Sequence, residues 1–157
     1  MKHVVPIMKR QGAGSIINNA SIAGVGSGYG PLVYSAAKAA VINATKWVAM
    51  ELAAEGIRVN SISPGAVYSP IFAKVWGPEG QDPTTTEQKV RNAFSRFVPV
   101  GRPGEGAEVG ALLAYLASDE SAYVTGQDIA IDGGLTTGVT WLQKQQNMSA
   151  ILSAMQD

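Results

Sequence analysis

Residues 21–38 read S-I-A-G-V-G-S-G-Y-G-P-L-V-Y-S-A-A-K. This stretch places a hydroxyl (Ser21), a phenol (Tyr34) and an amine (Lys38) within eighteen residues. The four-residue separation of Tyr34 and Lys38 predicts that both lie on one face of a helix. Ser21 follows an apolar run that is typical of a strand. A strand end, a glycine-rich loop and a helix start can therefore bring the three groups around one small ligand.

The sequence on either side of this stretch alternates between strand and helix patterns. Strands are predicted at residues 15–19 and 57–62, and a shorter one is predicted around Ile129. Helices are predicted at residues 31–55, where many alanines permit close packing, and at residues 105–118. The glycines of residues 24–30 are interpreted as a loop. Such an alternation indicates an open α/β sheet.

Two further segments do not belong to this alternation. Residues 68–104 are rich in proline and polar residues and are interpreted as a long, partly helical lid. Within the lid, T-T-T-E at residues 84–87 resembles a helix cap. The tail at residues 140–157 is predicted to form a helix with an apolar stripe that needs a partner. The stripe consists of Met148, Ile151, Leu152 and Met155.

Composition argues against several classes of function. The chain has 157 residues, of which 12 are basic and 12 acidic, so its charge gives no reason to expect nucleic acid or a membrane surface as a partner. It has no cysteine, and His3 is its single histidine, which leaves almost no material for a metal site or a Ser–His–Asp triad. No uninterrupted apolar run reaches the length of a membrane span, and the N-terminus has no apolar core long enough for a secretory signal. We therefore expect a cytoplasmic protein.

Four elements together resemble the classical short-chain dehydrogenase/reductase family over about residues 12–138. They are Ser21, the Tyr34-x-x-x-Lys38 spacing, N-S-I-S-P-G at residues 60–65, and T-G-Q at residues 125–127 followed by D-G-G. The resemblance implies a Rossmann-like three-layer α/β fold, of which this chain holds only the last three parallel strands. It also implies an oxidoreductase that transfers hydride between a secondary alcohol and a ketone with NAD or NADP, the choice between them being open.

The same resemblance assigns roles to individual residues. Tyr34 would be the acid/base, Lys38 would tune it and hold the nicotinamide ribose, and Ser21 would orient the substrate oxygen. A free tyrosine has a pKa of about 10, so a phenol that ionises near neutral pH needs roughly 4 kcal/mol of extra stabilisation, which a nearby lysine cation can supply. Further residues implied to line the cofactor, beside Tyr34 and Lys38, are Pro64, Gly65, Val67 and Ser69, the last in a place where the family often has threonine.

Other interpretations of these motifs stay open. The glycines of residues 24–30 also have the spacing of a phosphate-binding loop, but we favour a substrate loop because they lie between Ser21 and Tyr34. Enoyl reductases of related fold usually space their tyrosine and lysine more widely. Sugar epimerases and dehydratases share the tyrosine–lysine spacing but lack the Pro-Gly and D-G-G context. Asp132 of the D-G-G element is expected to serve in a turn rather than in catalysis.

The first half of the family's domain has no counterpart in this sequence. Its glycine-rich phosphate loop, its Asn-Asn-Ala-Gly segment and its catalytic asparagine cannot be placed here. We therefore expect residues 1–157 to be a single partial domain from a fragment or a truncated gene product, with a bare edge on the strand at residues 15–19. By itself the chain is expected to bind cofactor poorly. The alternative is a non-catalytic remnant that acts only through oligomerisation.

The helix at residues 34–55 and the apolar start of the lid each indicate a binding partner. The helix at residues 34–55, which carries Trp47, is expected to pack against a second copy in a dimer or tetramer. The substrate is expected to be a small alcohol or ketone, and the apolar start of the lid favours a hydrophobic one, cyclic compounds included. The lid residues behind this hypothesis are Val67, Ile71, Phe72, Val75 and Trp76.

Overall fold

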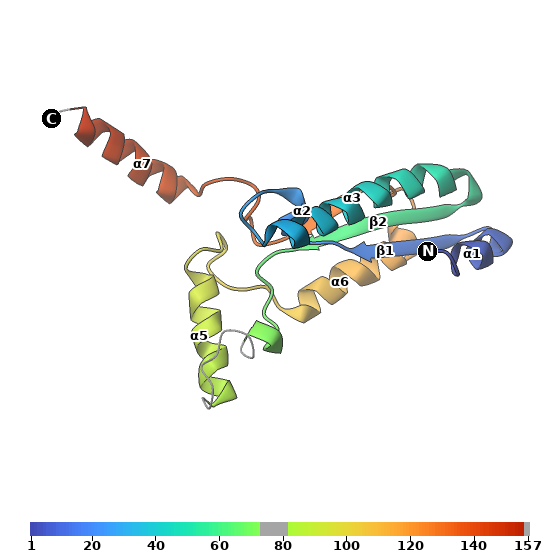
Figure 1. Cartoon of the computed structure of the whole chain (residues 1–157), viewed down its shortest axis with the longest axis horizontal. Helices are drawn as coiled ribbons and strands as arrows, with labels where there is room; N and C mark the ends of the chain where they lie inside the picture. Colours follow the sequence, from blue (N-terminus) through green and yellow to red (C-terminus); the bar gives the residue numbers. More distant parts are fainter. Residues whose placement is uncertain (73–81, 156–157) are drawn as a thin grey trace.

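The computed structural model describes residues 1–72 and 82–155. Its centre is a parallel sheet of three strands, β1 (Gly14–Asn19), β2 (Ile57–Pro64) and β3 (Asp128–Ile131), in the order β1-β2-β3 (Figure 1). This confirms the prediction of an α/β fold with three parallel strands. Among the described residues β1 is an edge strand, as predicted for residues 15–19.

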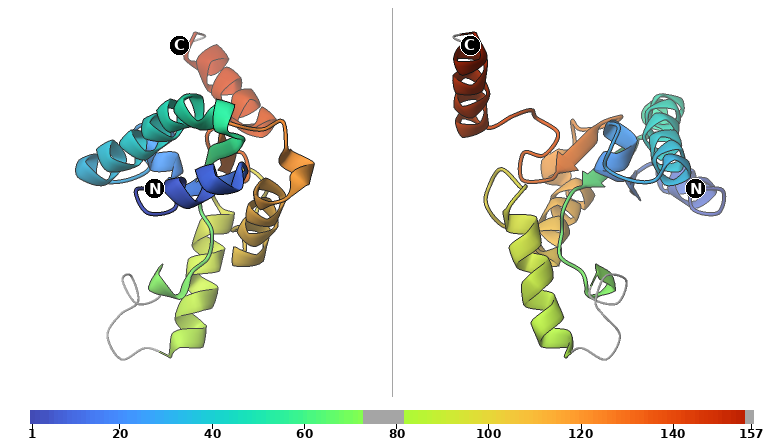
Figure 2. Two further views of the ribbon diagram at one scale, coloured as in Figure 1. Left: turned by 90° about the vertical axis from the view of Figure 1, so that its right-hand side faces the viewer. Right: turned by 60° about the vertical axis from the view of Figure 1, so that its left-hand side comes forward.

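Helices cover both faces of the sheet and give three layers. On one face lie α2 (Ile22–Val25) and α3 (Leu32–Leu52), and on the other lies α6 (Gly106–Ala117) (Figures 1 and 2). A short first helix, α1 (Val5–Gln11), lies beside the start of β1 and ends at Gly12, whose φ of 68° is the left-handed conformation that glycine adopts readily.

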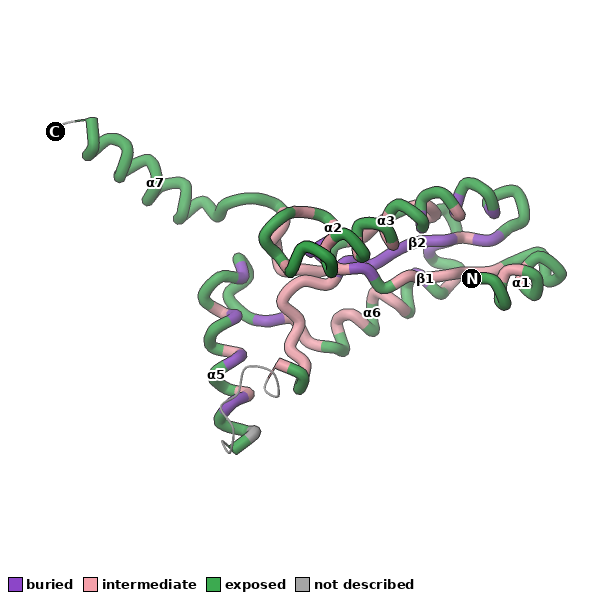
Figure 3. Tube along the Cα trace, viewed as in Figure 1, coloured by how far each residue is buried: buried purple, intermediate pink, exposed green. Residues whose placement is uncertain are grey.

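The central strand β2 is buried on both sides, which differs from the simple alternation that its sequence suggested (Figure 3). Its polar residues are tolerated because each has partners. The Asn60 amide donates to the Val124 carbonyl at 2.8 Å and accepts from the Gln127 backbone N–H at 3.0 Å. Two buried serines of β2 also donate to the Asp128 carboxylate of β3. The N-S-I-S-P-G motif therefore fastens β2 to the chain around β3.

The long helix α3 carries the main core. Its Ala49 and Leu52 are buried against Ile57 and Val59 of β2. Its Thr45 is also buried and accepts a 2.8 Å hydrogen bond from the side chain of Asn18 in β1. The helix starts after Pro31 and continues as a 3-10 turn to residue 55, so the prediction for residues 31–55 is confirmed.

The loop predicted at residues 24–30 is wrong at its start, because Gly24 and Val25 belong to the short helix α2. Gly24 lies where α2 crosses α3. A Cβ atom added to it would come within 2.6 Å of the Lys38 backbone carbonyl carbon. This close approach of two backbones accounts for Gly24 by packing alone.

This crossing gives a stability prediction with a matched control. Gly24→Ala is expected to lower the free energy of unfolding by about 1–3 kcal/mol, because α2 must move away from α3. Gly110→Ala in α6 meets nothing within 4 Å and is expected to raise it by up to about 1 kcal/mol through helix propensity. Urea unfolding of both variants measures the difference. A Gly24→Ala protein as stable as the Gly110→Ala protein would contradict the packing seen here.

The lid contains α5 (Pro83–Ser95), which stands away from the sheet (Figures 1 and 2). The cap predicted at residues 84–87 is wrong. Asp82 is the N-cap, its carboxylate accepts from the Thr85 N–H at 3.0 Å, and Pro83 occupies the first helical position. Pro83 suits that position because the N–H it lacks has no partner inside a helix.

The tail forms α7 (Trp141–Ala154), which projects from the sheet and its helices (Figure 1). All its residues are exposed, so the predicted apolar stripe is uncovered in the single chain (Figure 3). Among the described residues, no helix is both long and apolar enough to span a bilayer.

Candidate active site

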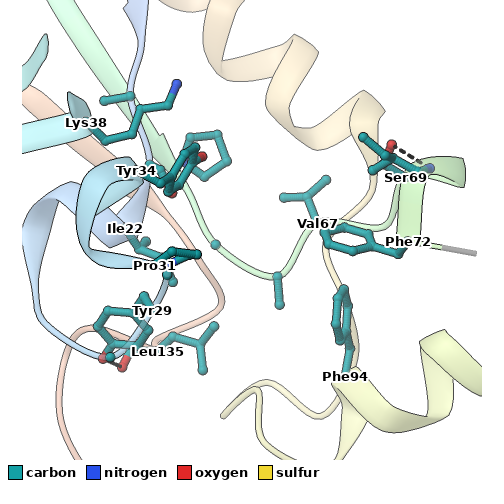
Figure 4. A pocket seen from close by; sticks show the side chains of 18 of the residues that line it. Ile22, Tyr29, Pro31, Tyr34, Lys38, Val67, Ser69, Phe72, Phe94 and Leu135 are labelled. Atoms are coloured by element: carbon teal, nitrogen blue, oxygen red, sulfur yellow. Dashed lines mark hydrogen bonds between the residues drawn. The ribbon is translucent and has the colours of Figure 1, made fainter. Parts of the chain in front are cut away.

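The site residues predicted from the sequence all line one cavity of about 1010 Å³. It lies where the chain leaves the carboxyl ends of β1 and β2, the place where open α/β sheets bind ligands. Three of these residues come from the segment after β1 and from α3. The other four lie at the last position of β2 or shortly after it (Figure 4). In chain order they are Ser21, Tyr34, Lys38, Pro64, Gly65, Val67 and Ser69.

Ser21 is held at the start of α2. It is the N-cap of that helix, and its Oγ accepts a hydrogen bond from the Ala23 backbone N–H at 3.2 Å. A hydroxyl that accepts one bond still has its own proton to donate. The cap therefore fixes the position of the Ser21 oxygen beside the cavity and leaves it a donor.

Tyr34 and Lys38 lie one turn apart on α3, as predicted. The Lys38 Nζ is 5.6 Å from the centre of the Tyr34 ring, and the Tyr34 side chain is 45% exposed. Lys38 Nζ also donates to the carbonyl of Asn19, the last residue of β1, at 2.9 Å. This bond anchors the lysine to the sheet. An ammonium has three donors, so Lys38 can bind a ligand while keeping this anchor.

The segment after β2 reaches the cavity through a tight contact with the D-G-G element. A Cβ atom on Gly65 would lie 2.6 Å from the Cβ of Asp132, so only glycine fits at this position. The Asp132 carboxylate accepts from the N–H groups of Gly134 and Thr136, both at 2.8 Å. Burial raises its pKa, but these bonds and the one from the Thr136 hydroxyl lower it more, so the net pKa is below its ordinary value. The turn role expected of Asp132 is confirmed.

The last two predicted residues mark the lid side of the cavity. Val67 pairs with Gly104 in an isolated parallel bridge. Ser69 lies on the side of the cavity away from Tyr34, and its Oγ accepts from the Ile71 N–H at 3.5 Å (Figure 4). Ile71 and Phe72, two of the apolar lid residues, also line the cavity. Val75 and Trp76 lie outside the described residues.

Sequence reasoning missed several residues that line the cavity. Phe94 stacks edge-on against Phe72 at 5.1 Å and against Phe97 at 5.5 Å between ring centres. On the opposite wall the Tyr29 hydroxyl donates to the Leu135 carbonyl at 2.9 Å (Figure 4). The aromatic residues of the lid, Phe94 and Phe97 among them, were an available signal. Nothing in the sequence indicates that Tyr29 meets a residue 106 positions away.

An ion-pair cluster joins the lid helix α5 to α6. Arg91 pairs with Glu87 at 2.8 Å and with Glu105, and its guanidinium lies 4.1 Å from the centre of the Tyr68 ring. Glu105 is also the N-cap of α6, where it forms a capping box with Glu108. The aromatic lid wall therefore has a fixed attachment to the helix that covers the sheet.

The capping box predicts a loss of stability in acid. Hydrogen bonds from Arg102 and from the Glu105 backbone N–H lower the pKa of Glu108 to about 2, from an ordinary value of 4.5. Because the folded protein has the lower pKa, the stabilisation is complete above pH 4.5 and is lost as pH falls toward about 2. Urea unfolding at a series of pH values measures this. Glu108→Gln should be less stable near neutral pH and should lose less in acid, and a profile parallel to that of the parent would contradict the assignment.

Known proteins match most of the chain. The family model described as "Enoyl-(Acyl carrier protein) reductase" matches residues 1–136. The chain is 45% identical over 132 residues to the 3-oxoacyl-(acyl-carrier-protein) reductase of Thermotoga maritima, covering 84% of this chain and 49% of the relative. It is 43% identical over 138 residues to the trans-4-hydroxycyclohexanecarboxylate dehydrogenase of Sinomonas cyclohexanicum, covering 88% of this chain and 47% of the relative.

A solved structure shows the same arrangement of elements. It is the gluconate 5-dehydrogenase from Burkholderia cenocepacia J2315, in complex with NADP and tartrate, with a TM-score of 0.74 and 28% identity. The match covers 88% of this chain and 51% of that one. The chain therefore spans about half the length of the relatives it matches.

Proposed function

Because the chain belongs to the short-chain dehydrogenase/reductase family, whose matched members are oxidoreductases, we propose that it carries the catalytic part of an NAD- or NADP-dependent alcohol/ketone oxidoreductase. One observation carries the proposal. Ser21, Tyr34 and Lys38 line the same cavity as Pro64 and Gly65, so a proton donor, a positive charge and a strand end surround one space. Hydride transfer to or from an alcohol carbon needs such a set.

Each of the three polar residues has a task in ketone reduction. Tyr34 gives its proton to the carbonyl oxygen as hydride reaches the carbonyl carbon, and takes a proton from the alcohol in the reverse direction. Ser21 donates a hydrogen bond to the same oxygen and holds it in place. Lys38 puts positive charge beside the Tyr34 ring and stabilises the negative charge that the phenol oxygen gains when its proton leaves.

The residues present fit one half of a nicotinamide cofactor. Lys38 offers donors to a ribose hydroxyl, and Pro64 to Val67 form a strand end against which a nicotinamide ring can lie. Bound there, the nicotinamide would supply or accept the hydride. For the phosphates, α2 is a single turn of four residues, too short to act as an anion-binding helix terminus. We propose that the phosphate and adenosine sites belong to the half of the family's domain that this sequence does not contain, together with the choice between NAD and NADP.

Enoyl reduction and action through association alone are the two alternatives to carbonyl chemistry. Enoyl reduction would be in line with the description of the matching family model. Carbonyl chemistry is favoured here because Ser21 and Tyr34 are two hydroxyl donors suited to one oxygen, and because the tyrosine and lysine are only four residues apart. The comparisons do not support a remnant that acts only through association, because the matched relatives are named as a reductase and a dehydrogenase.

We also propose that α3 packs against a second copy of the protein in a dimer or tetramer. The outer face of α3 exposes Trp47 at 73% and Met50 at 66%, an unusual amount of apolar surface for one helix. Sedimentation measures the state directly. Trp47→Glu is expected to shift the protein toward the monomer, whereas Trp141→Glu on α7, which is also well exposed at 69%, should leave this contact unchanged. A monomeric parent would contradict the proposal.

A chimera tests the proposed activity. It joins this chain to the preceding half of the Thermotoga maritima relative, of which the matched region covers 49%. Folding is checked by circular dichroism and cofactor binding by titration before activity is assayed. The chimera is expected to reduce simple ketones with NADH or NADPH. A folded chimera that binds cofactor but neither reduces ketones nor oxidises secondary alcohols would refute the proposed function.

A further inference from the structure

We infer that the cavity selects uncharged, apolar, ring-bearing ketones and alcohols and rejects carboxylates, and that Phe97 is a specificity-determining residue. The inference rests on the proposed function, because it treats the space in front of Tyr34 as the substrate site. It goes further by stating which substituents the site excludes and which side chain decides this. Charge and shape support it independently.

The first line of support is the charge of the lining. Among the described residues that line the cavity there is no arginine, histidine or carboxylate, and Lys38 is the one charged side chain. Lys38 is tied to the Asn19 carbonyl at 2.9 Å and lies beside Tyr34, at the reacting end of the site. A carboxylate on the far end of a substrate would lose water without meeting a positive partner, which is unfavourable.

The nearby lid helix does not change this balance. Arg91 of α5 already pairs with Glu87 and Glu105 and covers the Tyr68 ring. None of these four residues lines the cavity. Turning Arg91 toward a substrate carboxylate would break both of these ion pairs, so its guanidinium is not available to a substrate.

The second line of support is shape. Tyr29 and Leu135 form one wall, joined by their 2.9 Å hydrogen bond, and the lid phenylalanines form the opposite wall (Figure 4). Phe97 is 55% exposed and Tyr29 is 42% exposed, although both line the cavity. An apolar ring that packs against either wall would cover aromatic surface and bury apolar area that now faces solvent.

Phe97 is the position at which this selectivity can be changed without opening the core. Phe94, on which Phe97 rests, is 4% exposed and belongs to a buried cluster with Val90 and Val98. Phe97 is more exposed, so its ring faces the cavity and is not part of the buried core. The relative from Sinomonas cyclohexanicum is named for a cyclohexane ring that carries a carboxylate. Because no cation lines the lid side of the cavity among the described residues, we expect this chain to bind such a ring without the carboxylate.

Ligand-observed NMR on the 157-residue chain tests the inference with two probes that differ at one group. They are 4-methylcyclohexanone and 4-oxocyclohexanecarboxylate. We expect the methyl ketone to bind at least about tenfold more tightly. Phe97→Arg should move that ratio at least about tenfold toward the carboxylate, because it supplies the missing positive charge. Phe97→Leu, the apolar control, should keep the parent's order, and circular dichroism checks the folding of both variants.

Three outcomes of this binding experiment would contradict the inference. Equal or tighter binding of the carboxylate by the parent, an unchanged ratio in folded Phe97→Arg, or no binding of either ketone would overturn the inference. Binding does not depend on hydride transfer, so the two proposals fail separately. A chimera that reduces ketones while the parent chain prefers the carboxylate would refute the selectivity alone. Selective binding by a chain whose chimera is inactive would refute the proposed function alone.

Discussion

Tyr34→Phe is expected to reduce ketone turnover by the chimera by about 10²–10⁴-fold, the usual contribution of a general acid/base. The substitution removes one oxygen and leaves the ring beside Lys38. Because the Tyr34 side chain is 45% exposed and outside the buried core, the fold and the cofactor affinity should stay close to those of the parent. Steady-state rates and a cofactor titration measure the two effects separately.

Tyr29→Phe is the matched control for this experiment. It makes the same chemical change in the same cavity but removes only the hydrogen bond to the Leu135 carbonyl. Its turnover should fall by no more than a few-fold, in line with the loss of about 1 kcal/mol from one neutral hydrogen bond. If the two variants lost turnover equally, or if Tyr34→Phe retained a substantial part of it, Tyr34 would not be the acid/base.

The second large effect concerns cofactor affinity. The 157-residue chain is expected to bind NADH and NADPH at least about a hundredfold more weakly than the chimera, with no saturation below about 1 mM. In the proposed function Lys38 and the segment after β2 hold the nicotinamide and its ribose, whereas α2 is too short to hold the phosphates. Titration followed by fluorescence or calorimetry measures both affinities.

A smaller ligand provides the control for that titration. Reduced nicotinamide mononucleotide has the ring and the ribose but no adenosine half, so it should bind the chain and the chimera with similar, weak affinity. Micromolar binding of either full cofactor by the chain alone would show that the chain contains a phosphate site after all. The glycines of residues 24–30 would then be the leading candidate for that phosphate site, because their spacing resembles a phosphate-binding loop.

The parts of the fold that the sequence predicts well are those governed by local pattern. The alternation of strands and helices located β1 and β2 with ends correct to within about two residues, the usual margin for such boundaries. It also placed β3 around Ile129 and predicted α3 together with the 3-10 turn that follows it. The sequence alone did not show whether the polar residues around Asn60 are buried. They are buried because their partners, Val124 and Gln127, come from a distant segment that no local pattern reveals.

The candidate site shows the same division between local and distant information. Ser21, Tyr34 and Lys38 were found because a short motif places them, and they line one cavity in the structure. Ile71 and Phe72 of the lid were also expected near the substrate, and both line the cavity. Two other lining residues were not singled out: Phe97 reaches the cavity through the packing of the lid, and Tyr29 reaches it through a loop that bonds to Leu135. In our proposal these residues contact the substrate, so the sequence motifs predict the chemistry of the site more readily than its selectivity.

The most direct measurement is the product that the chimera forms from 2-cyclohexenone and NADH or NADPH. This compound offers a carbonyl and a carbon–carbon double bond in one ring, so a single chromatogram separates ketone reduction from enoyl reduction. With Ser21 and Tyr34 holding the carbonyl oxygen, the proposed function predicts 2-cyclohexenol, and its loss in Tyr34→Phe. Formation of cyclohexanone instead, with the carbonyl intact, would contradict the proposed carbonyl chemistry.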